Sequence, residues 1–335
     1  MTDETHILLA HGNGGRLMRE LIDAVFVPHL ANPYLDVQAD AATVPHGDGR
    51  LMLTTDAFTV QPLEFPGGDI GTLAVHGTVN DLAVAGAVPL YMTLSMVIEE
   101  GFEVSRLERI AMSIGRAARE SGVAVVAGDT KVVRRGEGGG LYIAATGIGI
   151  RARDRQLGMR EIQAGDRILV SGPVGDHGIS VLLAREEFGL AGEVRSDCAS
   201  VLGLTRALLP LPGLRFMRDP TRGGLAAVLN ELCRASSLGV ALHEAAIPIR
   251  PAVRSVCEML GYDPLYLACE GRVVAVVAKQ DVEAAMRAWR QLPEGQGAEV
   301  IGTVTAGRPY VTLQTIIGGE RLLDELEDDP LPRIC

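Results

Sequence analysis

The chain has few aromatic residues and no paired cysteines. Its 335 residues include six Phe, six Tyr and one Trp against 40 Gly, so we expect a core of small aliphatic side chains joined by many tight turns. The five cysteines form no CxxC pair and lie far apart, at positions 198, 233, 257, 269 and 335. This spacing excludes a disulfide framework and a zinc site, and the odd number leaves a free thiol, which suits a reducing cytosol.

Basic charge and long apolar segments are also scarce. The formal net charge is −11, which argues against a nucleic-acid partner because phosphate backbones are bound by basic surfaces. The longest uncharged segment, 82–98, contains Gly86 and Pro89 and is too short to span a membrane; it predicts a buried helix, a turn and a buried strand. The first 15 residues contain no basic apolar signal segment. We therefore expect a cytoplasmic protein that binds neither membrane nor nucleic acid.

The length and the 47% hydrophobic content favour two domains of α+β type. Both halves alternate strand, glycine-rich turn and helix, and the polar connector 151–166 separates them. We place an N-terminal domain at 1–158, a C-terminal domain at 159–320 and a tail at 321–335. The elements predicted around the first-half motifs are strands at 51–56, 123–127 and 141–150 and helices at 16–27, 82–87 and 105–122.

Residues Gly12, Asn13, Gly14 and Gly15 form a glycine-rich turn before the predicted helix 16–27. Free backbone N–H groups and the positive end of a helix dipole make such a turn suitable for phosphate. It is not a Walker A loop, since no Lys-Ser/Thr pair follows. An ordinary loop before a helix is the alternative.

Three aspartates are predicted at the ends of strands or the starts of helices: Asp56, Asp81 and Asp129. Loops at such positions commonly carry functional groups. Mg²⁺ prefers a few carboxylate oxygens together with water and substrate phosphates, which this set could supply. Aspartate is also a common turn and N-cap residue, so one such residue alone carries no weight.

The second half offers a further anion site and a candidate base. Arg222 lies in a glycine-rich segment before the predicted helix 225–235, where it could contact an anion or simply lie on the surface. Glu270 lies between two apolar segments, where partial burial is expected to raise the pKa of its carboxyl group. A carboxylate of this kind is a candidate general base, although a lone Glu in a turn is more often exposed.

The chain ends in a proline-rich, acidic segment. Two prolines precede Cys335, which is the last residue, and an acidic run occupies 324–329. Proline excludes a buried strand or helix interior, and the acidic side chains favour solvation. The sequence predicts a mobile arm that carries a thiol, with an ordinary frayed terminus as the alternative.

Taken together, these motifs resemble the HypE family, the carbamoyl dehydratases of NiFe-hydrogenase maturation. The matching segments run from residue 10 to the last residue: AHGNGG (10–15), TD (55–56), HGTVNDLAVAGAVP (76–89), GDTKVV (128–133), SGPVGDHG (171–178), RDPTRGG (218–224), CEG (269–271) and PRIC (332–335). Several of these are shared with selenophosphate synthetase, aminoimidazole ribonucleotide synthetase and thiamine-phosphate kinase. The terminal PRIC distinguishes the HypE family from these relatives.

The resemblance implies a two-domain PurM-like (AIR synthetase-like) fold, a homodimer formed through the N-terminal β-sheet and a flexible tail. It also implies that a HypF-type carbamoyltransferase loads a carbamoyl group onto Cys335. ATP and Mg²⁺ then support its dehydration to a thiocyanate, and a HypC–HypD complex accepts the cyanide.

The same resemblance, together with the chemistry of the residues, implies a role for each site residue. Cys335 carries the group because sulfur is a good nucleophile and later a good leaving atom. Lys131 offsets developing charge and Glu270 removes the N–H proton. Mg²⁺ is assigned to Asp56, Asp81 and Asp129. ATP is assigned to the remaining motif residues: Gly12, Asn13, Gly14, Gly15, Asn80, Thr130 and Arg222.

Two other functions remain open. A different ATP-dependent synthetase of the same superfamily is one, although selenophosphate synthetase needs a reactive Cys or Sec where His11 and Asn13 stand. A non-catalytic carrier, in which Cys335 only ferries a group, is the other. Hydrolysis of ATP after carbamoylation of the tail would separate the enzyme from the carrier.

Overall fold

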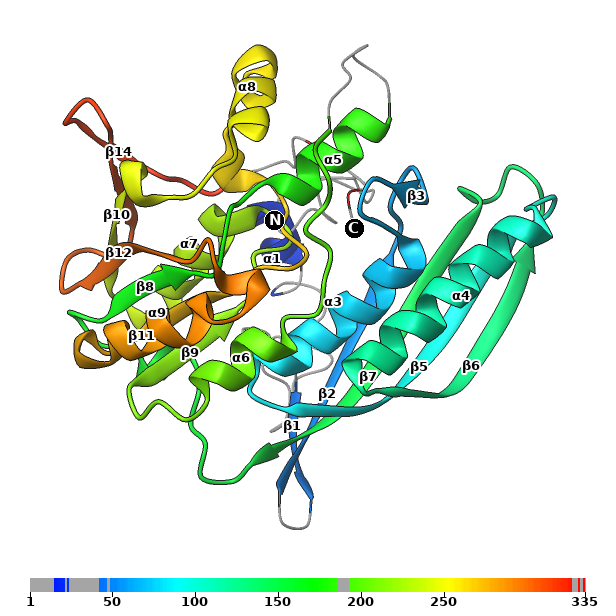
Figure 1. The fold of residues 1–335 in the computed structure, drawn as a ribbon, viewed down its shortest axis with the longest axis horizontal. Helices are drawn as coiled ribbons and strands as arrows, with labels where there is room; N and C mark the ends of the chain where they lie inside the picture. The colour runs from blue at the N-terminus through cyan, green and yellow to red at the C-terminus, as the bar shows by residue number, and fades with distance from the viewer. Residues whose placement is uncertain are drawn as a thin grey trace.

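The computed structural model describes residues 15–21, 23, 42–46, 49–185, 193–326, 331 and 334. These residues form two β-sheets with helices packed against them, so the fold is α+β as predicted (Figure 1). The five-stranded sheet lies within residues 42–152 and the seven-stranded sheet within 167–322.

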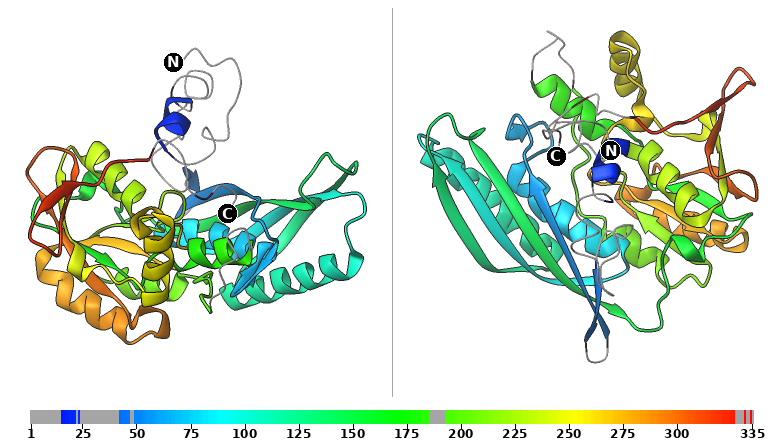
Figure 2. Two further views of the ribbon diagram at one scale, coloured as in Figure 1. Left: turned by 90° about the horizontal axis from the view of Figure 1, so that it is seen from above. Right: turned by 180° about the vertical axis from the view of Figure 1, so that it is seen from behind.

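The five-stranded sheet has the order β1-β2-β7-β5-β6. Its strands are β1 Ala42–His46, β2 Gly49–Phe58, β5 Val88–Glu99, β6 Ala124–Val133 and β7 Leu141–Ala152. A small hairpin of β3 Glu64–Phe65 and β4 Gly68–Asp69 follows β2. Helices α3 Ile70–Val84 and α4 Val104–Ser121 lie against one face of this sheet (Figures 1 and 2).

The seven-stranded sheet has the order β14-β13-β10-β12-β8-β11-β9. Its strands are β8 Arg167–Val170, β9 Leu214–Arg218, β10 Gly239–His243, β11 Val274–Val277, β12 Glu299–Thr305, β13 Val311–Gln314 and β14 Glu320–Leu322. The helices of this half are α5 Asp176–Ala184, α6 Leu202–Leu208, α7 Gly224–Ser236, α8 Pro251–Leu260 and α9 Val282–Arg290. Short 3₁₀ turns lie at Met159–Glu161, Glu244–Ala246, Pro264–Tyr266, Lys279–Asp281 and Pro293–Gly295. Near the N-terminus, α1 covers Arg16–Leu21.

Helix α3 corrects a prediction. The sequence predicted a helix that starts after Asp81, whereas Asp81 lies near the end of a helix that starts at Ile70. All residues of α3 except Asp81 are buried, so the helix has no polar face and no 3.6-residue pattern to reveal it. Its start is fixed by Asp69, whose side chain accepts the Thr72 N–H at 2.8 Å while Thr72 returns a bond to the Asp69 backbone.

Strand β6 corrects a second prediction. The strand was expected to end at Ala127, with Asp129 in the loop beyond it, but β6 continues to Val133. Parallel pairing with β5 carries the chain through the GDTKVV motif, from Ala124 opposite Tyr91 to Val133 opposite Glu99. Asp129 therefore lies within a strand, as does Asp56 in β2, and neither stands at a strand end.

Other predicted elements are confirmed with shifted ends. The helix predicted at 105–122 is α4, which ends at Gly122 in a left-handed conformation with φ 68°, although its N-cap is Glu103 and not Ser105. The strand predicted at 141–150 is β7, and the helix predicted at 225–235 is α7. The predicted start of the tail, residue 321, falls inside β14.

The largest hydrophobic cluster extends across both halves. A single cluster of buried side chains joins Leu73 of α3, Leu204 of α6 and Trp289 of α9. Leu331 and Ile334, two described residues of the tail, belong to this cluster and are each 4% exposed. This part of the tail is therefore packed, which differs from the solvated arm that its prolines and acidic residues predicted. Among the described helices, none combines the length and the apolar character needed to cross a membrane.

Candidate active site

A group of buried and half-buried charged side chains lies where the two halves meet. It contains Asp56 from β2, Asp219 and Arg222 from the segment between β9 and α7, and Glu270 from the segment before β11. Asp219 is 4% exposed and Glu270 is 2% exposed. The structure thus brings together three residues that the sequence singled out, Asp56, Arg222 and Glu270, and adds Asp219.

The carboxyl groups of this cluster hold their protons more tightly than usual. Burial raises the pKa of Asp219 to about 6 and raises the pKa of Asp56, while the Arg222 guanidinium partly offsets the shift at Asp56. Burial, followed by the neighbouring carboxylates of Asp219, Asp197 and Asp56, raises the pKa of Glu270 well above its usual value. The raised pKa predicted for Glu270 from sequence is confirmed.

Two polar side chains fix the backbone around Glu270. The amide of Asn80 donates to the carbonyl oxygens of Ala199 at 3.0 Å and Glu270 at 3.2 Å, and its oxygen accepts the Val201 N–H at 2.9 Å. Asp197 accepts the backbone N–H of Glu270 at 3.1 Å. Asn80 is 1% exposed and positions this segment, so its contact with ATP stays a prediction.

Arg272 extends this network away from Glu270. Its guanidinium lies 3.4 Å from Asp197 and 3.7 Å from Asp176, which also pairs with Arg250 at 2.9 Å. Burial and the nearby Asp197 raise the pKa of Asp176 to about 6 despite these arginines. The N–H of Glu270 is thus held by Asp197, which pairs with Arg272, and its carbonyl by the neutral amide of Asn80.

Asp81 lies on the same side of the five-stranded sheet as Asp56. Thr54 donates a 2.5 Å hydrogen bond to the Asp81 carboxylate, and Thr54 and Asp56 share a face of β2 because they are two residues apart. Two of the three predicted metal ligands are therefore oriented toward the same region.

Asp129 and Lys131 lie on the opposite face. Through the registers β2–β7, β7–β5 and β5–β6, Asp56 aligns with Gly128, so Asp129 and Lys131 point away from the side that carries Asp56. Three strand spacings separate β2 from β6 by about 14 Å. Asp129 and Lys131 pair at 3.5 Å and are 60% and 70% exposed. Within one chain they do not join the other site residues, and their assignments stay predictions.

Several predicted residues fall outside what the structure describes. These are Gly12, Asn13, Gly14, Cys335 and the side chain of Thr130. Gly15 is described and lies in the bend before α1. Within the described ranges no group of three or more His, Cys, Asp or Glu side chains has a metal-binding arrangement.

Cys269 does not have the properties of an acceptor thiol. Its side chain is fully buried, and its sulfur accepts the Gly175 N–H at 3.2 Å. Burial raises the pKa of this thiol well above its usual value, which keeps it protonated and unreactive. Its position next to Glu270 is therefore incidental to the chemistry.

The end of the described tail lies beside the same network. The Ile334 carbonyl is 2.9 Å from Nε2 of His177, and Nδ1 of His177 is 2.8 Å from the Ser196 hydroxyl. Sequence reasoning did not assign a role to His177, Ser196, Asp197 or Asp219. His177 and Asp219 lie inside the quoted motifs SGPVGDHG and RDPTRGG, whereas Ser196 and Asp197 lie in no motif and had no signal.

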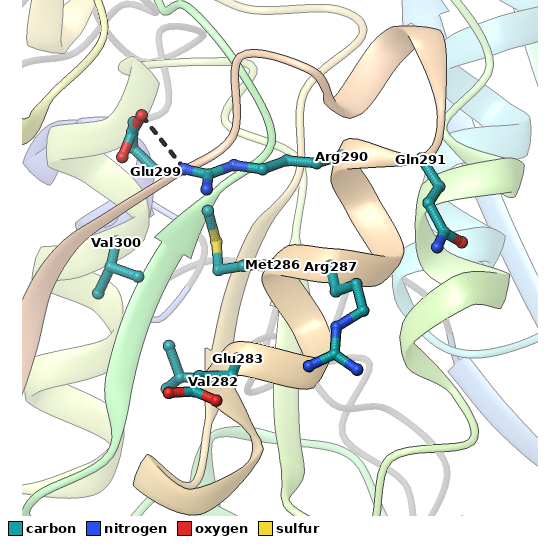
Figure 3. Close-up of a pocket in the computed structure, with 8 residues that line it drawn as sticks. All are labelled: Val282, Glu283, Met286, Arg287, Arg290, Gln291, Glu299 and Val300. Atoms are coloured by element: carbon teal, nitrogen blue, oxygen red, sulfur yellow. Dashed lines mark hydrogen bonds and ion pairs between the residues drawn. The ribbon is translucent and has the colours of Figure 1, made fainter.

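A surface hollow of about 650 Å³ lies elsewhere, between α9 and β12 (Figure 3). Met286 and Val300 form its apolar floor, and Arg290 pairs with Glu299 at 3.5 Å along its rim. None of the carboxyl cluster contributes to its lining, so this hollow is not the candidate active site.

Comparison with known proteins identifies both halves of the chain. Residues 38–151 match the AIR synthase related protein N-terminal domain, and 163–314 match the C-terminal domain of the same family. The chain is 46% identical to carbamoyl dehydratase HypE of Azotobacter vinelandii, with 98% of this chain and 96% of the relative covered.

Solved structures are equally similar. A HypE in a crystal structure of a HypE–HypF complex is 43% identical, with a TM-score of 0.87 and coverage of 91% of this chain and 99% of that chain. A hydrogenase maturation protein HypE solved in complex with ATP is 44% identical, with a TM-score of 0.82 and coverage of 98% and 100%. This chain therefore belongs to the HypE family of AIR synthase related proteins, the carbamoyl dehydratases of NiFe-hydrogenase maturation.

Proposed function

We propose that this chain dehydrates a carbamoyl group carried on the Cys335 thiol to a thiocyanate, with ATP as the activating substrate. The observation that carries the proposal is the place of the tail, whose Ile334 carbonyl contacts His177 while Ser196 binds the same imidazole. The residue after Ser196, Asp197, holds the backbone of Glu270. Hydrogen bonds through the consecutive residues Ser196 and Asp197 therefore connect the end of the tail to the candidate base Glu270. The ATP complex of a 44% identical HypE supports the choice of ATP.

The reaction needs two steps, because an amide oxygen is a poor leaving group. In the first step, the carbamoyl oxygen attacks the γ-phosphorus of ATP, ADP leaves and the nitrogen gives up one proton. In the second step, the C–O bond breaks with phosphate as the leaving group, the nitrogen gives up its second proton and the C≡N bond forms. The oxygen of the amide thus leaves in the phosphate, and the sulfur keeps its bond to carbon.

Glu270 is suited to the proton transfers. Burial and the neighbouring carboxylates raise the pKa of Glu270 well above its usual value, which makes its carboxylate a stronger base. One of its oxygens, Oε1, has no hydrogen-bond partner among the described residues, so it is available to a substrate N–H. Arg222, which offsets the charge of Asp56 and Glu270, would stabilise a phosphate bound near them.

The donor set fits Mg²⁺ when substrate phosphates complete it. Mg²⁺ usually takes one or two carboxylates together with water and phosphate oxygens, so a full protein cage is not required. Asp56 and Asp81 would hold it, and burial, which raises the pKa of Asp56, makes a bound cation a favourable partner for its carboxylate. When bound, the cation neutralises charge on the phosphates of ATP.

A second copy of the chain is proposed to supply the remaining groups. The face of the five-stranded sheet opposite α3 and α4 carries the half-exposed Leu51, Leu53 and Ile148 and the 49% exposed Tyr91. An apolar sheet face of this kind is suited to packing against its own symmetry mate. Asp129 and Lys131 lie on that face, so in a homodimer formed through it they would lie next to the second copy of the chain.

The proposed partners follow from the reaction. A HypF-type carbamoyltransferase supplies the carbamoyl group, which the HypE–HypF complex of a 43% identical relative supports. A HypC–HypD complex is proposed as the acceptor of cyanide. A non-catalytic carrier would share the tail and the partner but would not need Glu270, and the 46% identity to a carbamoyl dehydratase favours the enzyme.

Intact-protein mass spectrometry tests the proposal. Incubation with HypF, carbamoyl phosphate and Mg-ATP is expected to add about 43 Da to the chain and then remove one water when ATP is present. Cys335→Ala should remain unmodified and still bind ATP, and Cys257→Ala is the matched control that should react normally. An adduct that never loses water would establish the carrier, and an adduct on Cys335→Ala would place the acceptor elsewhere.

A further inference from the structure

The imidazole of His177 bridges two segments that are far apart in sequence. It lies in the first turn of α5 and is fully buried. One ring nitrogen, Nε2, is 2.9 Å from the carbonyl oxygen of Ile334, and the other, Nδ1, is 2.8 Å from the hydroxyl of Ser196. The ring therefore joins the end of the tail to the segment that precedes α6.

The hydrogen bonds of this bridge run from Ser196 through His177 to the Ile334 carbonyl. The Ser196 oxygen accepts the backbone N–H of Cys198 at 3.0 Å, so its own proton is free to be donated to Nδ1 of His177. A neutral imidazole that accepts at Nδ1 carries its proton on Nε2. A carbonyl oxygen can only accept, so Nε2–H donates to Ile334 and every group in the chain of bonds is satisfied. Burial lowers the pKa of His177, in agreement with this neutral form.

The orientation of the ring is fixed from both domains. Phe65 of β3 packs edge-on against the imidazole, with 5.3 Å between ring centroids and 86° between planes. The backbone N–H of Ser196 donates to the carbonyl of Pro66 at 2.7 Å. The hairpin of the N-terminal half thus holds both His177 and its partner in place.

The same segment also positions the candidate base. Asp197, next to Ser196, accepts the N–H of Glu270, and the N–H of Ala199 lies 3.4 Å from the Glu270 carbonyl. Residues 196–199 therefore contact the His177 bridge at one end and the backbone of Glu270 at the other. A change in how the tail is held is coupled through short contacts to the place where the proton is removed.

We propose that His177 is a positioning residue that seats the tail for dehydration, with Ser196 as the group that orients its ring. The proposal rests on the proposed function, in which Cys335 carries the carbamoyl group. A peptide group is planar, so the carbonyl oxygen of one residue and the Cα of the next are fixed relative to each other. Holding the Ile334 carbonyl therefore limits where the next residue, the terminal cysteine, can be.

A purely structural histidine would give a different result. Ile334, whose carbonyl His177 binds, is only 4% exposed, so under the proposed function the tail leaves this position when a second enzyme loads Cys335. The bond therefore exists only in the seated state and shifts the balance between seated and released tails. Removing it should favour release, which helps loading and hinders dehydration.

The experiment measures the two half-reactions separately on the full-length chain. In His177→Ala, loading of Cys335 by HypF and carbamoyl phosphate should be unchanged or faster. Single-turnover dehydration of the loaded chain with Mg-ATP should be about five- to tenfold slower. His177→Gln, whose amide can still donate near the Nε2 position, should recover part of the dehydration rate. The dehydration rate of Ser196→Ala should lie between those of wild type and His177→Ala. His243→Ala, an exposed histidine on β10, is the matched control and should change neither rate.

A readout that does not depend on catalysis accompanies these rates. Hydrogen exchange of the last five residues, followed by mass spectrometry, should be faster in His177→Ala than in wild type, while ATP affinity stays the same. Equal slowing of loading and dehydration, or unchanged exchange of the tail, would overturn the proposal. Failure of the proposed function has a different signature, since wild type itself would then gain no adduct on Cys335 or would never lose water.

Discussion

Glu270 is a carboxyl group whose surroundings oppose its ionisation. It is 2% exposed, close to the carboxylates of Asp219, Asp197 and Asp56, and one of its oxygens has no hydrogen-bond partner within the described part of the chain. Glu270→Gln keeps the size of the side chain and removes the basic oxygen. We expect loading of Cys335 to proceed and dehydration to slow by about 10²- to 10⁴-fold in single-turnover assays.

The control for this substitution is Glu258→Gln, an exposed residue of α8 that should behave as wild type. Dehydration at the normal rate in Glu270→Gln would mean that another group removes the protons.

Asp81 is the second residue whose role can be isolated. Thr54 donates to its carboxylate at 2.5 Å, and the amide oxygen in Asp81→Asn can accept the same bond, so the fold should be preserved. Loss of the negative charge should weaken Mg-ATP binding by about 10- to 100-fold in calorimetry. Asp154→Asn, at an exposed position of the connector, serves as the control, and unchanged affinity in Asp81→Asn would remove Asp81 from the metal site.

Individual site residues were predictable to the extent that their chemistry is visible in a motif. Asp56, Arg222 and Glu270 come together in one group, and the burial that raises the pKa of Glu270 was expected from its apolar flanks. Ser196 and Asp197 could not be predicted, because their importance comes from contacts with segments that are distant in sequence: Ser196 with Pro66, and Asp197 with Glu270. Such contacts depend on tertiary structure and leave no local pattern.

Helix α3 contains a histidine whose protonation should weaken the fold. His76 is 8% exposed, its Nδ1 has no hydrogen-bond partner among the described residues, and burial lowers its pKa to about 4 from an ordinary 6.5. Between these two values the unfolded chain binds more protons than the folded one, so its contribution to stability is lost as the pH falls from 6.5 toward 4. The loss at pH 4.5 is about 2–3 kcal/mol relative to pH 7.5.

Urea unfolding of wild type and His76→Gln at the two pH values measures this contribution. The carboxyl groups with raised pKa, Asp219 among them, act in the opposite direction, so the comparison between the two proteins is the informative quantity. His76→Gln should lose less stability on acidification than wild type, whereas His243→Gln should match wild type. Equal losses in all three proteins would show that His76 titrates normally.

Elements were predicted well where one face is polar and poorly where burial is complete. The amphipathic α4 was predicted within one residue of its ends, because its apolar and polar residues alternate with helical period. Helix α3 is buried on all sides and contains Gly71 and Gly77, which lower helix propensity but allow close packing: a Cβ at Gly77 would lie 2.9 Å from Phe58. The prediction ended strand β6 too early, at residue 127, because Gly128 and Asp129 are residue types that are disfavoured in strands.

For the whole molecule, the exposed sheet face gives a direct test of association. Tyr91 is 49% exposed on that face, so Tyr91→Asp would place a charge in the proposed interface. We expect wild type to be a dimer in sedimentation velocity experiments and Tyr91→Asp to be largely monomeric with an unchanged circular dichroism spectrum. Tyr310→Asp, which alters a 41% exposed tyrosine of the other half, should remain dimeric. A dimer of Tyr91→Asp would place the interface elsewhere.

The overall organisation was predictable from composition and from the alternation of motifs, but the junction between the halves was not. The two sheets fall on either side of the predicted boundary, yet one core runs through both halves and includes Leu331 and Ile334 of the tail. The described tail residues that follow β14, namely 323–326, 331 and 334, lie in no helix or strand. The prolines and acidic residues of the tail do not indicate whether Leu331 and Ile334 are buried in the core.

The separation of Lys131 from Glu270 has a genetic consequence. If each site of a dimer takes Glu270 from one chain and Lys131 from the other, a mixed dimer of Lys131→Ala and Glu270→Gln chains contains one site with both defects and one site with none. Two inactive proteins, once allowed to exchange subunits, would then regain activity. If both residues of a site came from the same chain, every site in the mixed dimer would keep one defect. Recovery of activity on mixing two inactive variants therefore shows that Lys131 and Glu270 of one site come from different chains.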